Sequence, residues 1–315
     1  MWSEETFALV REGIDAARQC RATHLSERWV SDLENRKHVL NLDLKKSSMN
    51  IVIFHIKIPD HASKIDTPDI KGGDSNNIDY KKLLDLNVKI ARWLQPDANI
   101  IILTDKIFGE NLEDNSFVKV IRMDVKGEEP MFERVVAMNA YVRSSLFSAP
   151  TVFLDIDAFM LRPLNNVFNN YFDIGLTHRH IVGQMSINEG VIFANNQRHE
   201  KVIKFFDSYL ASYLEAEKSA RVAKIYKNIR RWRGGQLAIN AAAGGHQFYS
   251  TSLCQTEYGT RIAYLPCSKY NLSQISEKEV NKDLRRRCSV LHLKGNRKGW
   301  VEKLVQGLAF YGFEI

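Results

Sequence analysis

Two aspartates separated by one residue follow an apolar run near the middle of the chain. Residues 151–154, Thr-Val-Phe-Leu, are typical of a buried strand, and Asp155 and Asp157 come directly after it. Side chains two positions apart on extended backbone point the same way, so both carboxylates can reach one point past the end of the strand. Ligands bind at that end of the strands in open α/β sheets. Two hard oxygen donors there predict a Mg²⁺ or Mn²⁺ site that also takes phosphate oxygens from a substrate.

A polar corner and a helix start come later in the chain. Asn188, Glu189 and Gly190 precede the apolar residues Val-Ile-Phe-Ala, and Gly190 lets a ligand or another backbone approach closely. Gln236 follows the pair Gly234-Gly235 at the start of an expected helix, which places a lone amide at the mouth of that helix. We treat these polar residues as candidates for substrate contacts.

The last candidate segment runs from Val290 to Trp300. His292 lies on a short apolar strand, and a loop with two glycines and three cations follows it. Imidazole suits Mn²⁺ as a third ligand beside carboxylates. Lys298 and the backbone amides around Gly295 suit phosphate. The segment therefore predicts a contribution to the same metal and phosphate site.

Bulk properties describe an ordinary globular chain with a positive charge. The 315 residues are 44% hydrophobic, 26% charged and 10% aromatic, which allows one large α/β domain. A net charge of +7 and a pI near 9.1 favour an anionic partner. The four cysteines show no zinc or CxxC spacing, and we find no signal peptide and no apolar run of membrane-spanning length. We therefore expect a reduced, cytoplasmic protein, with possible peripheral contact at an anionic membrane face.

The elements that must position these residues alternate between strands and helices. We expect a helical arm over residues 1–46, then an α/β domain over 47–315 that divides into two halves at about residue 163. Strands are expected at 50–58, 99–104, 117–121, 151–154, 172–176, 190–194, 261–265 and 289–293, and helices at 79–94, 131–147, 198–213, 215–232 and 236–243. This order predicts an α/β fold with a central, mainly parallel sheet. The helical arm is a candidate homodimer contact.

Cations and polar residues also occur on the elements before the aspartates. Arg134 and Arg143 lie on the helix that precedes the aspartate strand, and the strand 99–104 ends in Thr104 and Asp105. We add Arg134, Thr104 and Asp105 to the candidates for binding the nucleotide.

Taken in order, the motifs resemble those of metal-dependent glycosyltransferases of the GT-A fold, closest to the glycogenin and bacterial lipooligosaccharide galactosyltransferase group. That family has an Asp-x-Asp after its fourth strand, an Asn-x-Gly corner, a Gln at a helix start and a final His-x-x-Gly-x-x-Lys-x-Trp. The chain matches these with Asp155-Ile-Asp157, Asn188-Glu-Gly190, Gln236 and the segment His292–Trp300, over about residues 50–300. The last match is the most specific, because four positions agree in type and spacing.

The resemblance implies that residues 47–315 are a catalytic domain, with a donor-binding half over about 47–163 and an acceptor half over about 164–315. It also implies roles for the matched residues. Asp155, Asp157 and His292 would bind Mn²⁺, and Lys298 with Gly295 would hold the diphosphate of a nucleotide-sugar, with uridine as the expected base. Asn188 and Gln236 would lie beside the transferred sugar. The acceptor would be a glycan, a lipid-linked saccharide or a protein, as in polysaccharide biosynthesis.

The chain also departs from the family pattern. Gly235 stands where the family has Asp, and His55-Ile-Lys57 stands where acidic residues read the uracil. The family's donor-binding arginine falls near Met138, so Arg134, one turn earlier, is assigned in its place. A neutral Gln236 beside the sugar fits a retaining reaction, because an inverting enzyme needs a carboxylate to take the acceptor proton. Glu189 is the candidate for that base.

Three other functions remain open from the sequence. Haloacid dehalogenase phosphatases also have a strand followed by Asp-x-Asp, but on their first strand, whereas here three strands precede the motif and Phe159 stands where they have Thr or Val. A sugar-nucleotide pyrophosphorylase would need a Gly-rich, Arg-containing loop after its first strand. The basic segments 224–233 and 285–287 would suit a nucleic-acid- or membrane-surface-binding module, although solvated helix faces are the preferred interpretation and nucleic acid is not an expected partner.

Overall fold

The structure is a computed structural model that describes residues 48–58, 78–123, 125, 127–179, 186–218, 234–244 and 253–314. The expected N-terminal helical arm and most of the expected basic helix at 215–232 lie outside the described residues. Of the helices that are described, none is both long and apolar enough to cross a membrane. Cys254, Cys267 and Cys288 are free thiols.

An eight-stranded sheet forms the centre of the molecule, in the order β3-β2-β1-β4-β7-β6-β9-β8. The first four of these pair in parallel, β7 runs antiparallel to both β4 and β6, β9 is parallel to β6, and β8 is antiparallel to β9. The predicted α/β fold with a mostly parallel sheet is confirmed. The strands are β1 (Asn50–Phe54), β2 (Asn99–Asp105), β3 (Val118–Met123), β4 (Thr151–Asp155), β6 (Ile174–His178), β7 (Ile187–Ala194), β8 (Leu253–Gln255) and β9 (Arg261–Pro266).

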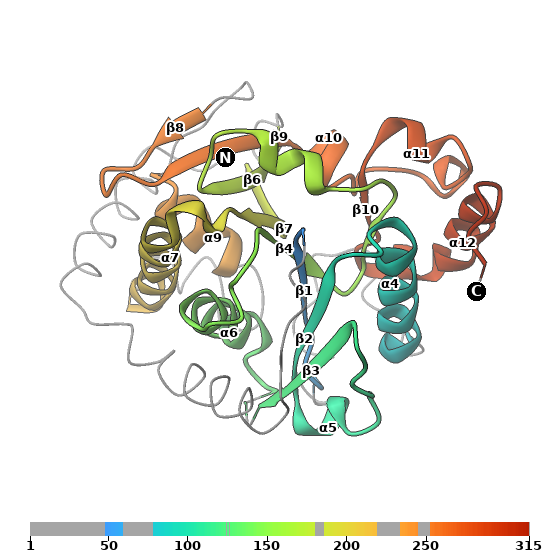
Figure 1. The fold of residues 1–315 in the computed structure, drawn as a ribbon, viewed down its shortest axis with the longest axis horizontal. Helices are drawn as coiled ribbons and strands as arrows, with labels where there is room; N and C mark the ends of the chain where they lie inside the picture. Colours follow the sequence, from blue (N-terminus) through green and yellow to red (C-terminus); the bar gives the residue numbers. More distant parts are fainter. Residues whose placement is uncertain are drawn as a thin grey trace.

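Helices cover both faces of this sheet (Figure 1). On one face lie α6 (Pro130–Arg143), α7 (His199–Lys218) and α9 (Gly234–Ala242), and on the other lie α4 (Tyr80–Leu94) and α12 (Val301–Ala309). Successive residues of a strand point to opposite faces, so Val52 and Phe54 of β1 pack in one apolar core while Ile51 and Ile53 pack in the other. This double burial explains why the parallel strands are continuous apolar runs.

The remaining short elements connect these layers. They are α5 (Lys106–Gly109), α10 (Cys267–Tyr270), α11 (Leu284–Arg287) and four 3₁₀ turns at Asn165–Asn169, Asn196–Arg198, Glu277–Glu279 and Gly295–Trp300. None of these short helices was expected from the sequence, because one helical turn leaves no periodic pattern. The long helix α12 was also missed, and α9 begins at Gly234 rather than Gln236.

A separate two-stranded sheet brings the end of the chain to the aspartates. Strand β5 (Ala158–Met160) follows Asp157 directly and pairs antiparallel with β10 (Val290–His292). In this register His292 lies opposite Ala158, and the backbone N–H of Leu293 donates to the carbonyl of Asp157 at 2.9 Å. This pairing places the histidine beside the aspartates although more than a hundred residues separate them.

Candidate active site

The side chains of Asp155, Asp157 and His292 converge at the carboxyl end of β4. One ligand atom from each lies within 4.8 Å of the others. His292 Nε2 is 3.0 Å from Asp157 Oδ1 and 3.5 Å from Asp155 Oδ2. Two ligands bound ~2.1 Å from one metal at a right angle are ~3 Å apart. The three side chains therefore fit a divalent metal with their present spacing.

Asn271 fixes the orientation of the His292 ring. The amide nitrogen of Asn271 donates to Thr177 Oγ1 at 2.8 Å and to the carbonyl of Asn188 at 3.1 Å, so its oxygen faces the ring and accepts from His292 Nδ1 at 2.9 Å. This leaves the Nε2 lone pair directed at the two carboxylates. Burial lowers the pKa of His292, against an opposing effect of Asp157. The neutral imidazole is the form that binds a metal.

Asn271 gave no signal in the sequence, because a lone asparagine after a short helix is common. We predict that Asn271→Leu weakens Mn²⁺ binding by about 10- to 100-fold, the usual effect of losing a residue that orients a metal ligand. Manganese titration followed by electron paramagnetic resonance measures this directly, without any donor. Asn271→Asp keeps an acceptor for Nδ1 and serves as the matched variant. An unchanged manganese affinity in folded Asn271→Leu would contradict the role.

Buried cations neutralise the two aspartates. Lys298 Nζ lies 3.3 Å from Asp157 Oδ2, and Arg134 Nη2 lies 3.0 Å from Asp155 Oδ1. Burial disfavours charge on Asp157, but the positive charges around it, that of Lys298 among them, outweigh that effect and hold its pKa below the usual range. Gly295, three residues before Lys298, has a positive φ of 57°. The loop after β10 thus turns at this glycine and returns Lys298 to the metal ligands.

Glu189 is buried, and one oxygen of its carboxylate has two partners. Its carboxylate oxygen Oε2 lies 3.2 Å from Arg134 Nη1 and accepts from the Tyr209 hydroxyl at 2.6 Å, while its backbone carbonyl accepts from Arg134 Nη2 at 2.7 Å. A Cβ at Gly235 would lie only 1.9 Å from this oxygen. Burial raises the pKa of Glu189, against an opposing effect of Arg134. Glycine at 235, which departs from the family pattern, thus makes room for this carboxylate.

Two further predicted residues, Gly190 and Asn188, lie at the same site. A Cβ at Gly190 would lie 2.2 Å from His292 Cε1 and 2.8 Å from Asp155 Oδ2, so only glycine leaves room for the metal ligands. Asn188 is buried; its side-chain oxygen accepts from Lys294 Nζ at 2.8 Å. Its amide nitrogen has no hydrogen-bond partner among the residues that the structure describes. That unpaired donor is available to a ligand.

Other candidates lie farther out. Gln236 is in the first turn of α9 and follows Gly235, whose backbone lies against the Glu189 carboxylate. Thr104 and Asp105 end β2, which β1 separates from β4. Asp105 caps α5 by accepting from the Phe108 amide at 2.7 Å. These three residues are not part of the aspartate and histidine cluster.

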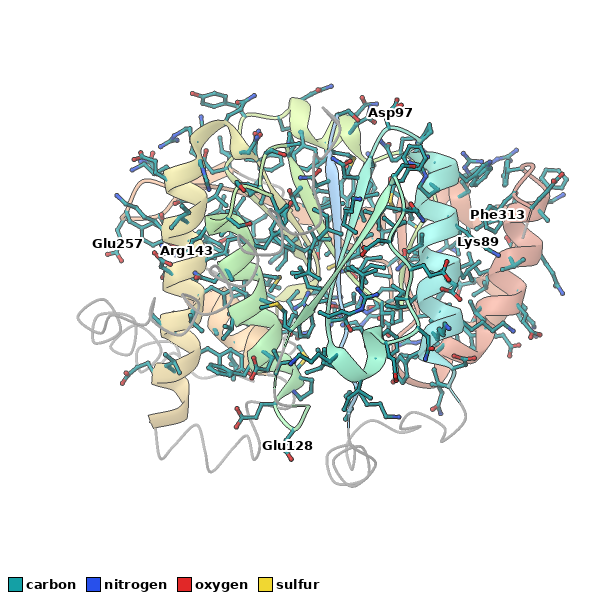
Figure 2. The ribbon with its side chains drawn as sticks, turned by 60° about the horizontal axis from the view of Figure 1, so that its bottom comes forward. Lys89, Asp97, Glu128, Arg143, Glu257 and Phe313 are labelled. Atoms are coloured by element: carbon teal, nitrogen blue, oxygen red, sulfur yellow. The ribbon has the colours of Figure 1, made fainter. Side chains whose placement is uncertain are left out.

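Arg143 is directed away from the site. It is the last residue of α6, and its guanidinium pairs with Asp207 of the neighbouring helix α7 (Figure 2). Arg134 lies nine positions earlier on the same helix, which corresponds to about 13 Å along the axis. Of Arg134 and Arg143, only Arg134 therefore reaches the aspartates.

The chain is similar in structure to several solved glycosyltransferases. Mouse xyloside xylosyltransferase 1 matches with 12% identity and a TM-score of 0.45, over 79% of this chain and 98% of that one. GlyE of Streptococcus pneumoniae TIGR4 matches with 11% identity and a TM-score of 0.46, over 84% of this chain and 63% of that one. Galactosyltransferase LgtC, solved with donor and acceptor sugar analogs, matches with 11% identity and a TM-score of 0.41, over 81% and 95%.

No protein-family model matches the sequence, and no curated protein matches it. At these identities and TM-scores the basis for assigning a function is the side-chain geometry at the end of β4.

Proposed function

We propose that the protein is a metal-dependent glycosyltransferase that moves a sugar from a nucleotide-diphosphate donor, a UDP-sugar, to a glycan, lipid-linked saccharide or protein. The observation that carries this is the convergence of four side chains from two segments remote in sequence on one point at the carboxyl end of β4. They are Asp155, Asp157, His292 and Lys298. Two carboxylates and a neutral imidazole suit Mn²⁺ or Mg²⁺, and a lysine beside them suits the phosphates that such a metal also binds.

Donor cleavage breaks the bond between the anomeric carbon and the diphosphate oxygen, and the bonding electrons stay on that oxygen. A divalent metal, when bound, supplies positive charge to this leaving group. Lys298 is held 3.3 Å from Asp157 Oδ2 and would donate to the same phosphate oxygens. The buried, unpaired amide nitrogen of Asn188 would donate to the sugar and orient it. Gln236, in the first turn of α9, is a second candidate for a contact to the sugar.

The environment of Glu189 supports a retaining reaction. An inverting enzyme needs a free carboxylate to take the proton of the acceptor hydroxyl. Glu189 is 3% exposed and its carboxylate is engaged by Arg134 and Tyr209, so it is placed to position Arg134 rather than to receive that proton. In a retaining reaction the acceptor proton passes to the departing diphosphate oxygen. The anomeric configuration of the product, read by proton NMR, tests this assignment.

The other functions considered from the sequence are not favoured. Strand β4, which leads into the aspartates, is the fourth strand among the residues that the structure describes, and Asp155 is paired with Arg134 rather than free to act as a phosphatase nucleophile. No observation in the described residues supports a nucleic-acid-binding face.

A screen of nucleotide-sugars with Mn²⁺, following release of the nucleoside diphosphate, tests the proposal. We expect metal-dependent release from at least one UDP-sugar and loss of release on chelation with EDTA. The control is Asp97→Asn, because Asp97 is exposed in the turn before β2 (Figure 2). That turn lies at the amino ends of the parallel strands, whereas the aspartates lie at the carboxyl ends. Release that is insensitive to both EDTA and Asp157→Asn would refute the metal-dependent reaction.

A further inference from the structure

Arg179 and Arg297 gather around Ser273 at the edge of the candidate site. Arg179 follows β6 directly, and Arg297 lies in the 3₁₀ turn that also carries Lys298. Arg179 Nη2 donates to Ser273 Oγ at 3.5 Å. Arg297 donates through Nη1 to the carbonyl of Ser273 and through Nε to the carbonyl of Lys294 at 3.2 Å. These contacts hold both guanidinium groups beside the same serine.

No described carboxylate is an ion-pair partner of the two guanidinium groups. In the part of the chain that the structure describes, no carboxylate lies within ion-pair distance of Arg179 or Arg297, whereas the buried Arg134 and Arg261 both pair with carboxylates. Residues 180–185, which follow Arg179, contain no Asp or Glu in the sequence. Burial lowers the pKa of Arg297, and the charge of Arg179 lowers it further. Such a like-charge pair favours an anion as its ligand.

The charged groups already assigned to the site balance one another without Arg179 and Arg297. The three buried or partly buried carboxylates of the site are balanced by three cations, and these six residues are Asp155, Asp157, Glu189, Arg134, Lys294 and Lys298. A divalent metal and a donor diphosphate neutralise each other. Arg179 and Arg297 therefore exceed what the donor and the metal require.

Their place in the sheet points to the acceptor. The end of β6 is separated from β4 by β7, on the side away from β1 and β2, where the nucleotide half of the domain lies. Both arginines are partly exposed and Ser273 is buried, so a ligand can reach the guanidinium groups from solvent. A planar guanidinium fork binds phosphate oxygens in pairs, and a phosphate monoester carries a charge of about −1.5 to −2 at neutral pH.

We propose that Arg179, Arg297 and Ser273 form a subsite for a phosphate group carried by the acceptor. That the phosphate belongs to an acceptor rests on the proposed glycosyltransferase function. The subsite itself rests on the two guanidinium groups, which have no carboxylate partner among the described residues. The acceptor would then be a phosphorylated glycan or a saccharide linked to a lipid through phosphate, rather than a neutral sugar.

The test uses sulfate, a tetrahedral dianion, as the probe. The protein is saturated with Mg²⁺ and UDP, and sulfate is titrated by calorimetry. We expect saturable binding that weakens by about tenfold or more in Arg179→Gln and in Arg297→Gln, the loss that corresponds to one charge-assisted hydrogen bond. Arg286→Gln is the matched control, since Arg286 is exposed and pairs with Asp283, and it should bind sulfate as the parent does.

Two outcomes would overturn the proposal. One is equal sulfate affinity in Arg179→Gln and in the parent, with the variant shown to be folded by its melting temperature. The other is competition between UDP–Mg²⁺ and sulfate, which would assign both arginines to the donor diphosphate. Failure of the glycosyltransferase function is a separate result: a protein that binds sulfate through Arg179 but does not bind UDP–Mg²⁺ would keep the anion site and lose the donor.

Discussion

Asp157→Asn is expected to lower donor turnover by about 10³-fold, comparable to removing a group that stabilises charge in a transition state. The amide keeps the shape of the side chain but removes the charge that faces both His292 Nε2, at 3.0 Å, and Lys298 Nζ, at 3.3 Å. The change therefore removes a metal ligand and releases the lysine proposed to hold the diphosphate. Initial rates of nucleoside diphosphate release, at saturating donor and Mn²⁺, measure the effect.

A second readout separates metal binding from chemistry. Manganese affinity of Asp157→Asn should fall in parallel with turnover, while Asp97→Asn should match the parent in both. His292→Ala should show the same two losses, because both side chains belong to one cluster. Normal turnover in either variant would remove that residue from the metal site.

Arg134→Met is expected to destabilise the fold by about 3–5 kcal/mol, the usual cost of removing one partner from a buried ion pair. Arg134 is 4% exposed and is the partner of both Asp155, at 3.0 Å, and Glu189, at 3.2 Å. Methionine fills much of the same space without the charge, so Glu189 would be left buried and uncompensated. Urea denaturation gives the free energy of unfolding.

The destabilisation should depend on pH. Burial already raises the pKa of Glu189 above that of an unfolded glutamate, and loss of Arg134 removes the largest effect that opposes it. A raised carboxyl pKa favours the folded state below the unfolded pKa, and this contribution is lost as the pH rises through the folded value. The gap between Arg134→Met and the parent should therefore be larger at pH 8 than at pH 5. Adding Glu189→Gln to Arg134→Met should narrow this stability gap at pH 8.

The matched control lies on the same helix. Arg143→Met removes an ion pair with Asp207 whose side chains are 26% and 29% exposed, and solvent screening limits such a pair to about 1 kcal/mol or less. Equal losses in the two variants would mean that helix α6, rather than the buried charge network, determines the stability of this region.

The sequence alone determined the order of the main elements and the chemistry of the metal ligands. Strands that are buried on both faces must be continuous apolar runs, so β1, β2 and β4 were readable. Asp155 and Asp157 follow one such run, and the spacing of extended backbone was enough to predict that they act together. His292 was joined to them only through the order of motifs along the chain, because no local rule links residues so far apart.

Only the tertiary structure decided which distant side chains meet. The pairing of β5 with β10 sets His292 opposite Ala158, and the short strand β5 leaves too weak a pattern to predict. Asn271 and Tyr209 orient His292 and Glu189 through single hydrogen bonds between elements remote in sequence. Such contacts depend on how the elements pack in three dimensions, whereas apolar periodicity records only which face of each element is buried.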